Sequence, residues 1–296
     1  MDGLLIIDKP AGITSHDVVA RVRRALETKR VGHTGTLDPF ATGVMVVLVG
    51  KATRLAQFLD KDEKEYEAIV QFGFETDTGD STGVRTAECG MRNDEIAKKL
   101  ELVDWSDVLR RFRGEIRQTP PMYSAKKVDG KKLYELARQG VEIERTAVNV
   151  AINELEIIDS DLRTPHSTLR VRVACSAGTY IRTLAEDIGR EVGIGAHLTE
   201  LRRTRAGKFT IDEAVKIDDV HESLLRPIDE AVEHLPEFEL REDRVAKTLN
   251  GMSTRDLSDS FTDGEQIRML GPNGELIAVG FFDEADKVIQ PKVVLG

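Results

Sequence analysis

The sequence of residues 32–49, GHTGTLDPFATGVMVVLV, joins a glycine-rich loop to an apolar strand. Three glycines and small neighbours let the backbone of residues 32–43 turn tightly and let a ligand approach it closely. Pro39 stiffens the chain beside a single carboxylate, Asp38, so the loop is expected to present that side chain rather than bury it. From spacing alone, the more common use of such an Asp is an ordinary tight turn. Residues 44–49 are predicted to form a buried strand.

Regular patterns on both sides of the loop predict further strands and helices. Thr14 and Asp17 have the spacing of a capping box, and the apolar residues that follow predict a basic amphipathic helix over about residues 15–27. Alternation of apolar and polar residues predicts half-buried strands, and helical spacing predicts short helices. The expected strands span residues 4–7, 66–74 and 169–173, and the expected helices span residues 96–103, 108–112 and 180–188.

The chain changes character at two places. Residues 118–150 contain Pro120, Pro121 and two lysine pairs, so we interpret this segment as an excursion from the main sheet. After Pro236, two apolar segments flank the turn at residues 271–274, which predicts a small β domain. A proline-bearing linker near residues 225–236 is the expected boundary.

The distribution of charge is uneven. The formal net charge is −10 at pH 7, which taken alone argues against nucleic acid as a partner. Basic residues nevertheless gather in three clusters. One such cluster is usually a solvated surface, but three of them on an acidic chain favour a polyanion bound in a local groove. The clusters are Arg21, Arg23, Arg24, Lys29 and Arg30; Lys126, Lys127, Lys131 and Lys132; and Arg202, Arg203, Arg205 and Lys208.

Cysteine usage and hydropathy indicate the cellular setting. Cys89 and Cys175 form neither a CxxC pair nor a Cys/His cluster, which argues against a disulfide framework and a structural zinc site. The longest apolar run, residues 44–49, is far shorter than the roughly 20 residues of a membrane span. No basic region precedes the first apolar run, so no signal peptide is predicted. We therefore expect a cytoplasmic protein with no membrane contact.

A second segment with candidate functional residues is CSAGTYIRT, residues 175–183, where a predicted strand leads into a helix. Arg182 lies two residues after Tyr180, so the two side chains are expected on different sides of the helix, with Arg182 free to reach a carboxylate. A surface position for Arg182 and a core position for Tyr180 fit the pattern equally well. By pattern alone, His33 fits a structural histidine and Tyr66 fits an ordinary edge aromatic.

A series of short motifs occurs in one order along most of the chain. They are LIIDKP (5–10), GHTGTLDP (32–39), ATG (41–43), KEY (64–66), TDT (76–78), QTPPMYSA (118–125), GKKLYE (130–135), GTYIR (178–182) and LRR (201–203). Together these motifs resemble the TruB family, the bacterial tRNA pseudouridine-55 synthases. Any one motif would be weak, but their number and order make the resemblance specific.

The resemblance implies a reaction and a set of roles. A uridine in the T loop of tRNA, uridine 55, would be isomerised to pseudouridine by breaking the bond from N1 to the ribose and rejoining the ribose through C5. The enzyme would be an isomerase, an intramolecular transferase, with no cofactor and no metal. Asp38 would be the essential carboxylate, Tyr66 the aromatic that stacks on the target base, and Arg182 the ion-pair partner of Asp38. The positions that contact RNA or line the pocket are matched by His33, Tyr180 and Leu201.

These residue types suit the implied chemistry. Asp38 has to be ionised, whether it attacks C1′ of the ribose or removes a ribose proton. We expect Arg182 to keep the pKa of Asp38 low in a pocket that excludes water. The target base has to leave its stack, and stacking on Tyr66 can return about 1 to 3 kcal/mol of that cost.

The resemblance also implies an α/β (α+β) fold of the pseudouridine-synthase type. We expect a mixed or antiparallel sheet with a central RNA cleft, an inserted thumb-like segment, and a small C-terminal β domain of the PUA-like type. The expected domains are residues 1–235 and 236–296, and the insertion at about 118–150 corresponds to the segment that grips the T-arm. Residues 237–296 hold 7 basic and 12 acidic residues, so weak RNA binding or a packing role is expected of the second domain.

The expected partner is the T-arm of tRNA, with no obligate protein partner and a monomeric state. One alternative is an RNA-binding or RNA-folding protein that uses the same scaffold without catalysis, and the presence of Asp38, Tyr66 and Arg182 argues against it. The other is a relative that depends on guide RNA and partner proteins. The insertion that begins at Gln118 favours the stand-alone form.

Overall fold

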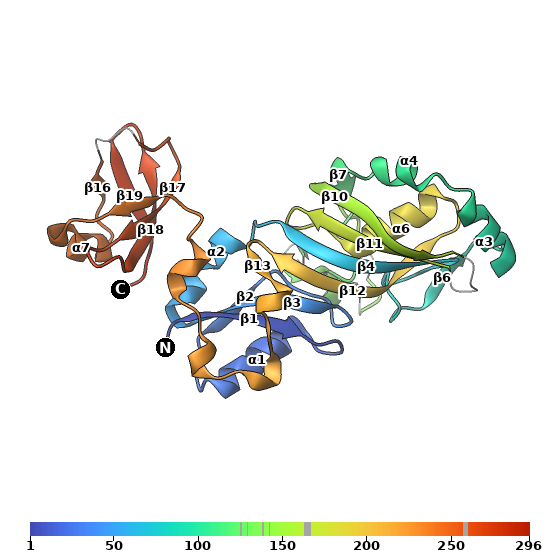
Figure 1. Cartoon of the computed structure of the whole chain (residues 1–296), viewed down its shortest axis with the longest axis horizontal. Helices are drawn as coiled ribbons and strands as arrows, with labels where there is room; N and C mark the ends of the chain where they lie inside the picture. The colour runs from blue at the N-terminus through green and yellow to red at the C-terminus, as the bar shows by residue number, and fades with distance from the viewer. Residues whose placement is uncertain (125, 129, 138, 142, 163–166, 257–259) are drawn as a thin grey trace.

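The apolar runs of the sequence become strands of one large mixed sheet in the computed structural model (Figure 1). The structure describes residues 1–124, 126–128, 130–137, 139–141, 143–162, 167–256 and 260–296. The predicted α/β fold, with a large mixed sheet and a β domain at the C-terminus, is confirmed. The sheet consists of β1 (Gly3–Lys9), β2 (Val31–Thr34), β3 (Thr42–Val49), β4 (Lys64–Phe72), β7 (Gly114–Gln118), β10 (Val148–Asp161), β11 (Thr168–Cys175), β12 (Ala196–Ala206), β13 (Phe209–Thr210) and β14 (Val215–Lys216).

Short strands and helices connect and cover this sheet. The paired short strands are β5 (Phe74–Thr76) with β6 (Arg85–Glu88) and β8 (Lys127–Val128) with β9 (Lys131–Lys132). The α-helices are α1 (Ser15–Ala25), α2 (Ala56–Leu59), α3 (Asn93–Glu101), α4 (Trp105–Arg110), α5 (Leu133–Ala137), α6 (Ile181–Glu191) and α7 (Glu242–Leu249). The 3-10 helices are η1 (Gly50–Leu55), η2 (Ile211–Glu213), η3 (Ile217–Asp219), η4 (Glu222–Leu224) and η5 (Ile228–Ala231).

Strand β12 joins the two halves of the sheet. The main path runs β14-β1-β3-β12-β4-β11-β10-β7, and β12 is parallel to β3 but antiparallel to β4. The parallel contact is short and pairs Arg202 with Thr42 and Arg203 with Gly43. Thr42 and Gly43 directly follow the loop that carries Asp38. The central strand β12 therefore lies next to this loop. The sequence patterns did not predict β12, nor the long strand β10.

Local signals set the ends of several elements. The Thr14 hydroxyl accepts a hydrogen bond from the Asp17 amide at 3.1 Å, and the Asp17 carboxylate accepts one from the Thr14 amide at 2.8 Å, so the predicted capping box begins α1. The predicted alternation is confirmed from Tyr66 to Phe72, where every second residue is buried. The strand then ends, because Gly73 adopts a φ of +119°, and Phe74 begins β5 instead of extending β4.

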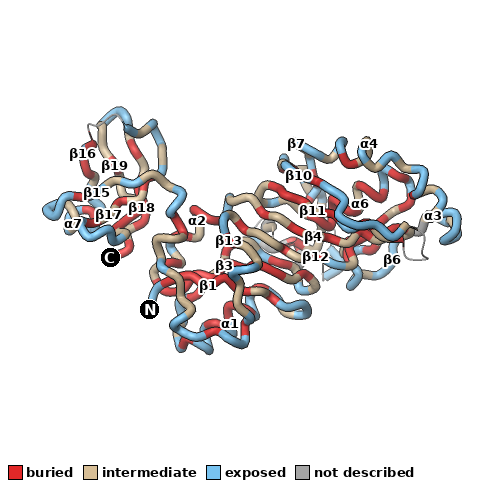
Figure 2. The backbone as a smooth tube through the Cα atoms, viewed as in Figure 1, coloured by how far each residue is buried: buried red, intermediate tan, exposed pale blue. Residues whose placement is uncertain are grey.

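Buried residues, red in Figure 2, occur along both halves of the sheet, and many of them are apolar. One cluster joins α6 to the half of the sheet around β4, β11 and β10, with Leu184 and Ile188 packed against residues such as Val171. A second cluster joins α1 to β1 and β3. The cavities described below open between these two halves.

The C-terminal region forms a sheet of its own, which lies apart from the main sheet in Figure 1. Its order is β15-β17-β18-β19-β16, from β15 (Glu237–Glu239), β17 (Gln266–Leu270), β18 (Leu276–Asp283), β19 (Val288–Val294) and β16 (Thr254–Arg255). The two strands predicted around the turn at residues 271–274 are present as β17 and β18. Val279 and Val293 share an apolar cluster with Phe58 and Leu59, so this sheet packs against the N-terminal half of the chain.

Within the described ranges, no helix combines the length and the apolar character that crossing a membrane requires.

Candidate active site

The loop that carries Asp38 is held from both sides. Lys9 at the end of β1 is fully buried, and its ammonium donates hydrogen bonds to the carbonyls of Pro39 and Ala41 at 3.3 and 2.6 Å. Ser15, the first residue of α1, accepts a hydrogen bond from the Leu37 amide at 2.9 Å. Burial lowers the pKa of Lys9 to about 8. The loop is therefore a tight turn that is also anchored to present its carboxylate.

Arg182 forms a two-point ion pair with Asp38. Its Nε lies 2.9 Å from Oδ2 of Asp38 and its Nη2 lies 3.2 Å from Oδ1. Two of the three remaining guanidinium hydrogens are donated to the carbonyls of Thr78 at 2.6 Å and Tyr123 at 2.7 Å. The Arg182 side chain is 4% exposed and that of Asp38 is 32% exposed, so the pair is fixed below the surface while the carboxylate stays reachable.

The start of α6 brings Tyr180 to the same place as Arg182. Tyr180 precedes the helix in an extended conformation, with φ of −101° and ψ of 105°, so helical geometry does not separate the two side chains as the sequence suggested. The buried Gln118 fixes this residue, since its side-chain amide donates to the Tyr180 carbonyl at 3.3 Å and accepts from the Tyr180 amide at 3.0 Å. Both Tyr180 and Arg182 line one cavity.

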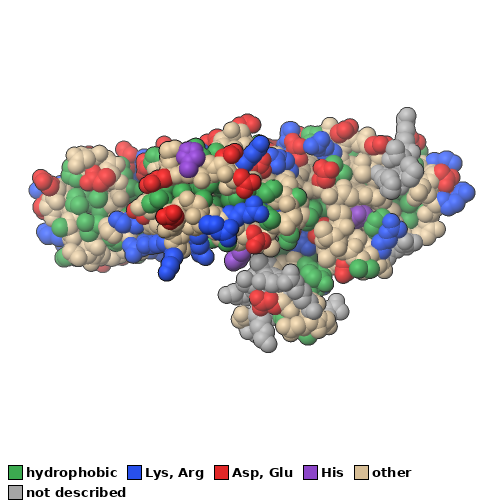
Figure 3. Space-filling view, turned by 90° about the horizontal axis from the view of Figure 1, so that it is seen from below, with side chains coloured by type: hydrophobic (Ala, Val, Ile, Leu, Met, Phe, Trp, Pro, Cys, Tyr) green, Lys and Arg blue, Asp and Glu red, His purple; other side chains and the backbone are tan. Residues whose placement is uncertain are grey.

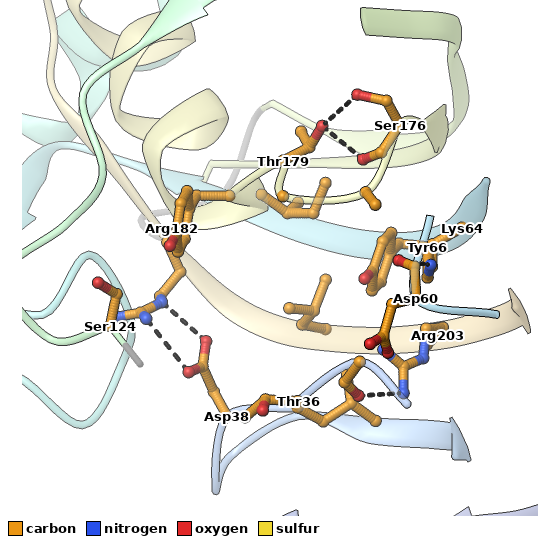
Figure 4. Close-up of a pocket in the computed structure, with 17 residues that line it drawn as sticks. Thr36, Asp38, Asp60, Lys64, Tyr66, Ser124, Ser176, Thr179, Arg182 and Arg203 are labelled. Atoms are coloured by element: carbon orange, nitrogen blue, oxygen red, sulfur yellow. Dashed lines mark hydrogen bonds and ion pairs between the residues drawn. The ribbon is translucent and has the colours of Figure 1, made fainter. Parts of the chain in front are cut away.

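That cavity has a volume of about 230 Å³ and gathers most of the predicted site residues (Figure 4). Figure 4 shows the Asp38–Arg182 pair on one side and Tyr66 with Lys64 and Arg203 on the other. Tyr66 is 9% exposed and projects from β4. The predicted residues that line the cavity are Asp38, Tyr66, Tyr180, Arg182 and Leu201.

His33, the sixth predicted residue, lines neither this cavity nor the second cavity described below. It lies in β2, opposite Val47, and its ring meets the ring of His16 edge-on at 5.8 Å between centroids. Its Nδ1 is buried without a hydrogen-bond partner among the residues that the structure describes. Burial lowers the pKa of His33 to about 4, so its ring is neutral at pH 7.

A second cavity of about 450 Å³ adjoins the first at the ion pair. Asp38 and Arg182 line both cavities, and the second is bounded further by His16, Phe40 and Tyr123. The carboxylate therefore stands between two spaces, each with aromatic side chains in its wall. An extended ligand could occupy both spaces while contacting Asp38.

The electrostatics of Asp38 correct one expectation. Burial raises the pKa of Asp38 above its ordinary value, and the Arg182 guanidinium opposes that rise without cancelling it. The nearby Asp80 carboxylate also raises the pKa of Asp38. Arg182 thus limits the cost of ionising a partly buried carboxylate, whereas the sequence predicted a pKa of Asp38 below its ordinary value.

Asp80 is a component of the site that the sequence patterns did not identify. It is 4% exposed, and its Oδ2 lies 3.8 Å from Nη1 of Arg182. Its other oxygen accepts hydrogen bonds from the Thr78 hydroxyl and the Thr82 amide, each at 2.9 Å. Arg182 therefore stands between two carboxylates, one reachable from the cavity and one locked in a turn. Hydroxyl residues on both sides of Asp80 were the available sequence signal.

Two further cationic side chains, Lys64 and Arg203, line the cavity. The sequence patterns placed Arg203 in a basic cluster and gave Lys64 no role. Lys64 is 5% exposed, and its ammonium donates to the carbonyls of Leu59, Asp60 and Asp62. Burial lowers the pKa of Lys64 below its ordinary value. Arg203 is 1% exposed, which contradicts its assignment to a basic surface cluster.

The rest of that third basic cluster is largely paired with acids. Arg202 binds Asp8 at 2.8 Å, Arg205 binds Glu63 at 2.6 Å, and Lys208 pairs with Glu233. The first cluster is exposed along and after α1. Figure 3 shows Lys and Arg side chains gathered in a band on the face seen from below. For the second cluster, the side chains of Lys127, Lys131 and Lys132 lie outside what the structure describes.

Two family models match adjoining parts of the chain. The model of the "TruB family pseudouridylate synthase (N terminal domain)" matches residues 23–181, which include the Asp38 loop, Tyr66 and the segment up to Tyr180. The model of the "tRNA pseudouridylate synthase B C-terminal domain" matches residues 182–242, which begin at Arg182 and include β12. The residues around the 230 Å³ cavity are therefore divided between the two matches: Asp38 and Tyr66 lie in the first, and Arg182 and Arg203 lie in the second.

Relatives and solved structures agree with these matches. The chain is 42% identical to "tRNA pseudouridine synthase B" of Heliobacterium modesticaldum, over 99% of this chain and 95% of the relative, and 38% identical to the protein of that name from Bacillus subtilis, over 100% and 98%. The fold matches a chain of the "Crystal Structure of a Cbf5-Nop10-Gar1 Complex" with a TM-score of 0.72 and 27% identity, over 99% of this chain and 85% of that one. On the sequence and the fold together, this chain belongs to the TruB family of pseudouridylate synthases.

Proposed function

We propose that this protein is a tRNA pseudouridine synthase that isomerises uridine 55 in the T loop, with Asp38 as its essential carboxylate. The observation that carries the proposal is the two-point ion pair between Asp38 and Arg182 in the wall of a cavity that also contains Tyr66. The names of the two relatives described above support tRNA as the substrate.

The site residues suit each part of this isomerisation. The flipped base would enter the 230 Å³ cavity and stack on Tyr66, with Tyr180 and Leu201 in the surrounding wall. Asp38 would attack C1′ of the ribose or remove a ribose proton, and either route needs the carboxylate form that Arg182 supports. The N1–C1′ bond breaks, the base turns, C1′ bonds to C5, the proton on C5 leaves, and N1 takes up a proton. Because reactant and product are isomers, no redox partner or group donor is required.

We further propose how the chain is divided and what it binds. Residues 1–235 would form the catalytic domain and residues 236–296 a small PUA-like domain. The segment at about 118–150 would grip the T-arm, with its lysines on phosphates that position the RNA without specifying sequence. The protein would act as a monomer and without the guide RNA or protein partners of more distant relatives.

One experiment tests this function directly. Purified full-length protein is incubated with an unmodified tRNA transcript and no additions, and pseudouridine is mapped by carbodiimide modification and primer extension. We expect pseudouridine at position 55 alone. A transcript with cytidine at that position is the matched control and should remain unmodified.

The role of Asp38 is tested in the same assay. Asp38→Asn should form no pseudouridine while its tRNA dissociation constant stays within about threefold of wild type, because the amide keeps the shape of the side chain but lacks the charge. Unchanged product yield in this variant would refute the assigned role. A wild-type protein that binds the transcript without modifying it would instead favour the RNA-binding alternative.

A further inference from the structure

Arg203 is a buried cation without a carboxylate partner in the part of the chain that the structure describes. It is 1% exposed, and among the described residues no ion pair joins its guanidinium to an Asp or Glu. Its neighbours on β12, Arg202 and Arg205, are more exposed and do form ion pairs, with Asp8 and Glu63. Burying an unpaired charge is costly, so a role beyond stability has to be sought for Arg203.

The guanidinium fastens both ends of the Asp38 loop. Its Nε donates to the Val44 carbonyl at 2.6 Å, and its Nη2 donates to the Gly35 carbonyl at 3.0 Å. Gly35 has a φ of +70°, and a Cβ there would lie 3.2 Å from Nη1 of Arg203. A Cβ on Gly43 would lie 2.1 Å from the Arg203 carbonyl oxygen. Two loop glycines therefore allow Arg203 to approach the backbone that carries Asp38.

On its other side, Arg203 meets Tyr66. The two residues are directly opposite in the antiparallel register of β12 and β4, and both line the 230 Å³ cavity. Opposite residues of an antiparallel pair share one face of the sheet. Burial raises the pKa of Tyr66, and the Arg203 guanidinium opposes that rise, which is the effect of a cation close to the phenol.

The chemistry of the two groups fixes the direction in which a proton can be offered. A guanidinium has only donor hydrogens, whereas a phenol has one donor and can also accept. A Tyr66 oxygen that faces Arg203 has to use its lone pairs toward it. The phenol hydrogen is then left to point into the cavity, where the carbonyl oxygens of a uracil base are acceptors.

We propose that Arg203 is a positioning residue for the reaction, which sets the Tyr66 ring against the Asp38 loop and leaves the Tyr66 hydroxyl to donate its hydrogen to a carbonyl of the target base. This inference rests on the proposed function, because it needs a uracil base in the cavity. The proposal also gives a reason for burying the Arg203 charge without a carboxylate partner among the described residues. The guanidinium holds the Asp38 loop and Tyr66 in fixed positions relative to each other.

The test is a double-mutant cycle measured as single-turnover pseudouridine formation, by tritium release from tRNA labelled at C5 of uridine. The variants are Arg203→Met, Tyr66→Phe and the two combined. Arg203→Met should slow the reaction about 100-fold, because a small misplacement of a site residue costs that much. In the Tyr66→Phe background, the same substitution should slow it at least about 10-fold less, because the hydroxyl it orients is absent. The tRNA dissociation constant should stay within about threefold throughout.

Controls separate this role from general stability. Arg226→Met removes two ion pairs far from the cavity, to Glu213 and Glu230, and should leave the rate within about threefold of wild type. If Arg203→Met does not fold, Arg203→Lys keeps the charge without the planar fork and replaces it in the cycle. Equal slowing in both backgrounds would overturn the proposal and leave Arg203 a structural clamp. Absence of pseudouridine with the wild-type protein would instead refute the proposed function.

Discussion

Nε and Nη2 of Arg182 contact the two carboxylate oxygens of Asp38 separately, at 2.9 and 3.2 Å, while Nη1 lies 3.8 Å from the buried Asp80. One guanidinium thus serves two carboxylates that differ in access to the cavity. Arg182 lowers the pKa of Asp38 and Asp80 raises it, so the ionisation of Asp38 depends on both neighbours. This relationship leads to two pH predictions of opposite sign.

The first prediction concerns Arg182→Lys. The role proposed for Asp38 requires its carboxylate form, so the rate should fall as the pH drops through the pKa of Asp38, which lies above the ordinary value of about 4. Lysine cannot contact both oxygens, so the acidic limb of the pH–rate profile should move about 1 unit higher. Single-turnover rates between pH 5 and 8 measure it. Arg190→Lys, on the same helix but paired with Glu75, is the control and should not move the limb.

The second prediction is the reverse shift in Asp80→Asn. The amide retains an oxygen for Thr78 and Thr82 but removes the negative charge that raises the pKa of Asp38. The acidic limb should therefore move to lower pH, while the maximal rate falls about 10-fold because Arg182 loses one of its fixed partners. Asp107→Asn, in α4 and paired with Arg110 and Arg111, is the matched control and should not move the limb. A limb displaced to higher pH would contradict the electrostatic role given to Asp80.

His33 should make stability depend on pH. Its folded pKa of about 4 is below the unfolded value of 6.5, so below pH 6.5 the unfolded state binds more protons and stability falls. The free energy of unfolding should decline by up to about 1.4 kcal/mol for each pH unit between 6.5 and 4 relative to His33→Gln. Urea titrations of both proteins at several pH values provide the comparison, and parallel curves would show that His33 titrates normally.

Lys9→Met should loosen the Asp38 loop. The substitution leaves the buried carbonyl of Ala41 without this donor, which costs about 1 to 3 kcal/mol of unfolding free energy, while the Pro39 carbonyl still accepts from the Gly12 amide at 2.8 Å. The reaction should slow as well, since both carbonyls belong to the loop that carries Asp38. Lys98→Met, at an exposed position of α3, is the control for removal of a lysine. Wild-type stability and rate in Lys9→Met would show that the loop holds its shape without the ammonium.

Neutralising Lys131 and Lys132 together should weaken tRNA binding and flatten its salt dependence. Each phosphate contact contributes about 1 to the slope of log K against log salt concentration, so the slope should fall by about 2. Filter binding at four salt concentrations measures the slope. No change would place both lysines on a solvated surface.

Local sequence patterns predicted many individual elements because their causes are local. The capping box at Thr14 begins α1, alternation over Tyr66 to Phe72 marks β4, and the turn at residues 271–274 joins two strands. These patterns depend on neighbours within a few residues. They missed β12, because a strand that contains LRRTR has no alternating apolar signature and its partner β4 lies more than 100 residues earlier in the chain.

The motifs identified most of the site side chains, including Asp38, Tyr66, Tyr180, Arg182 and Leu201, by resemblance to a family. The identity of those residues was a property of the sequence alone, since motif spacing does not depend on packing. Only the tertiary structure decided that Arg203 is buried opposite Tyr66, that Asp80 shares Arg182 with Asp38, and that His33 stands outside both cavities. Burial and charge pairing arise where distant strands meet, and no local pattern encodes which side chains the central strand will cover.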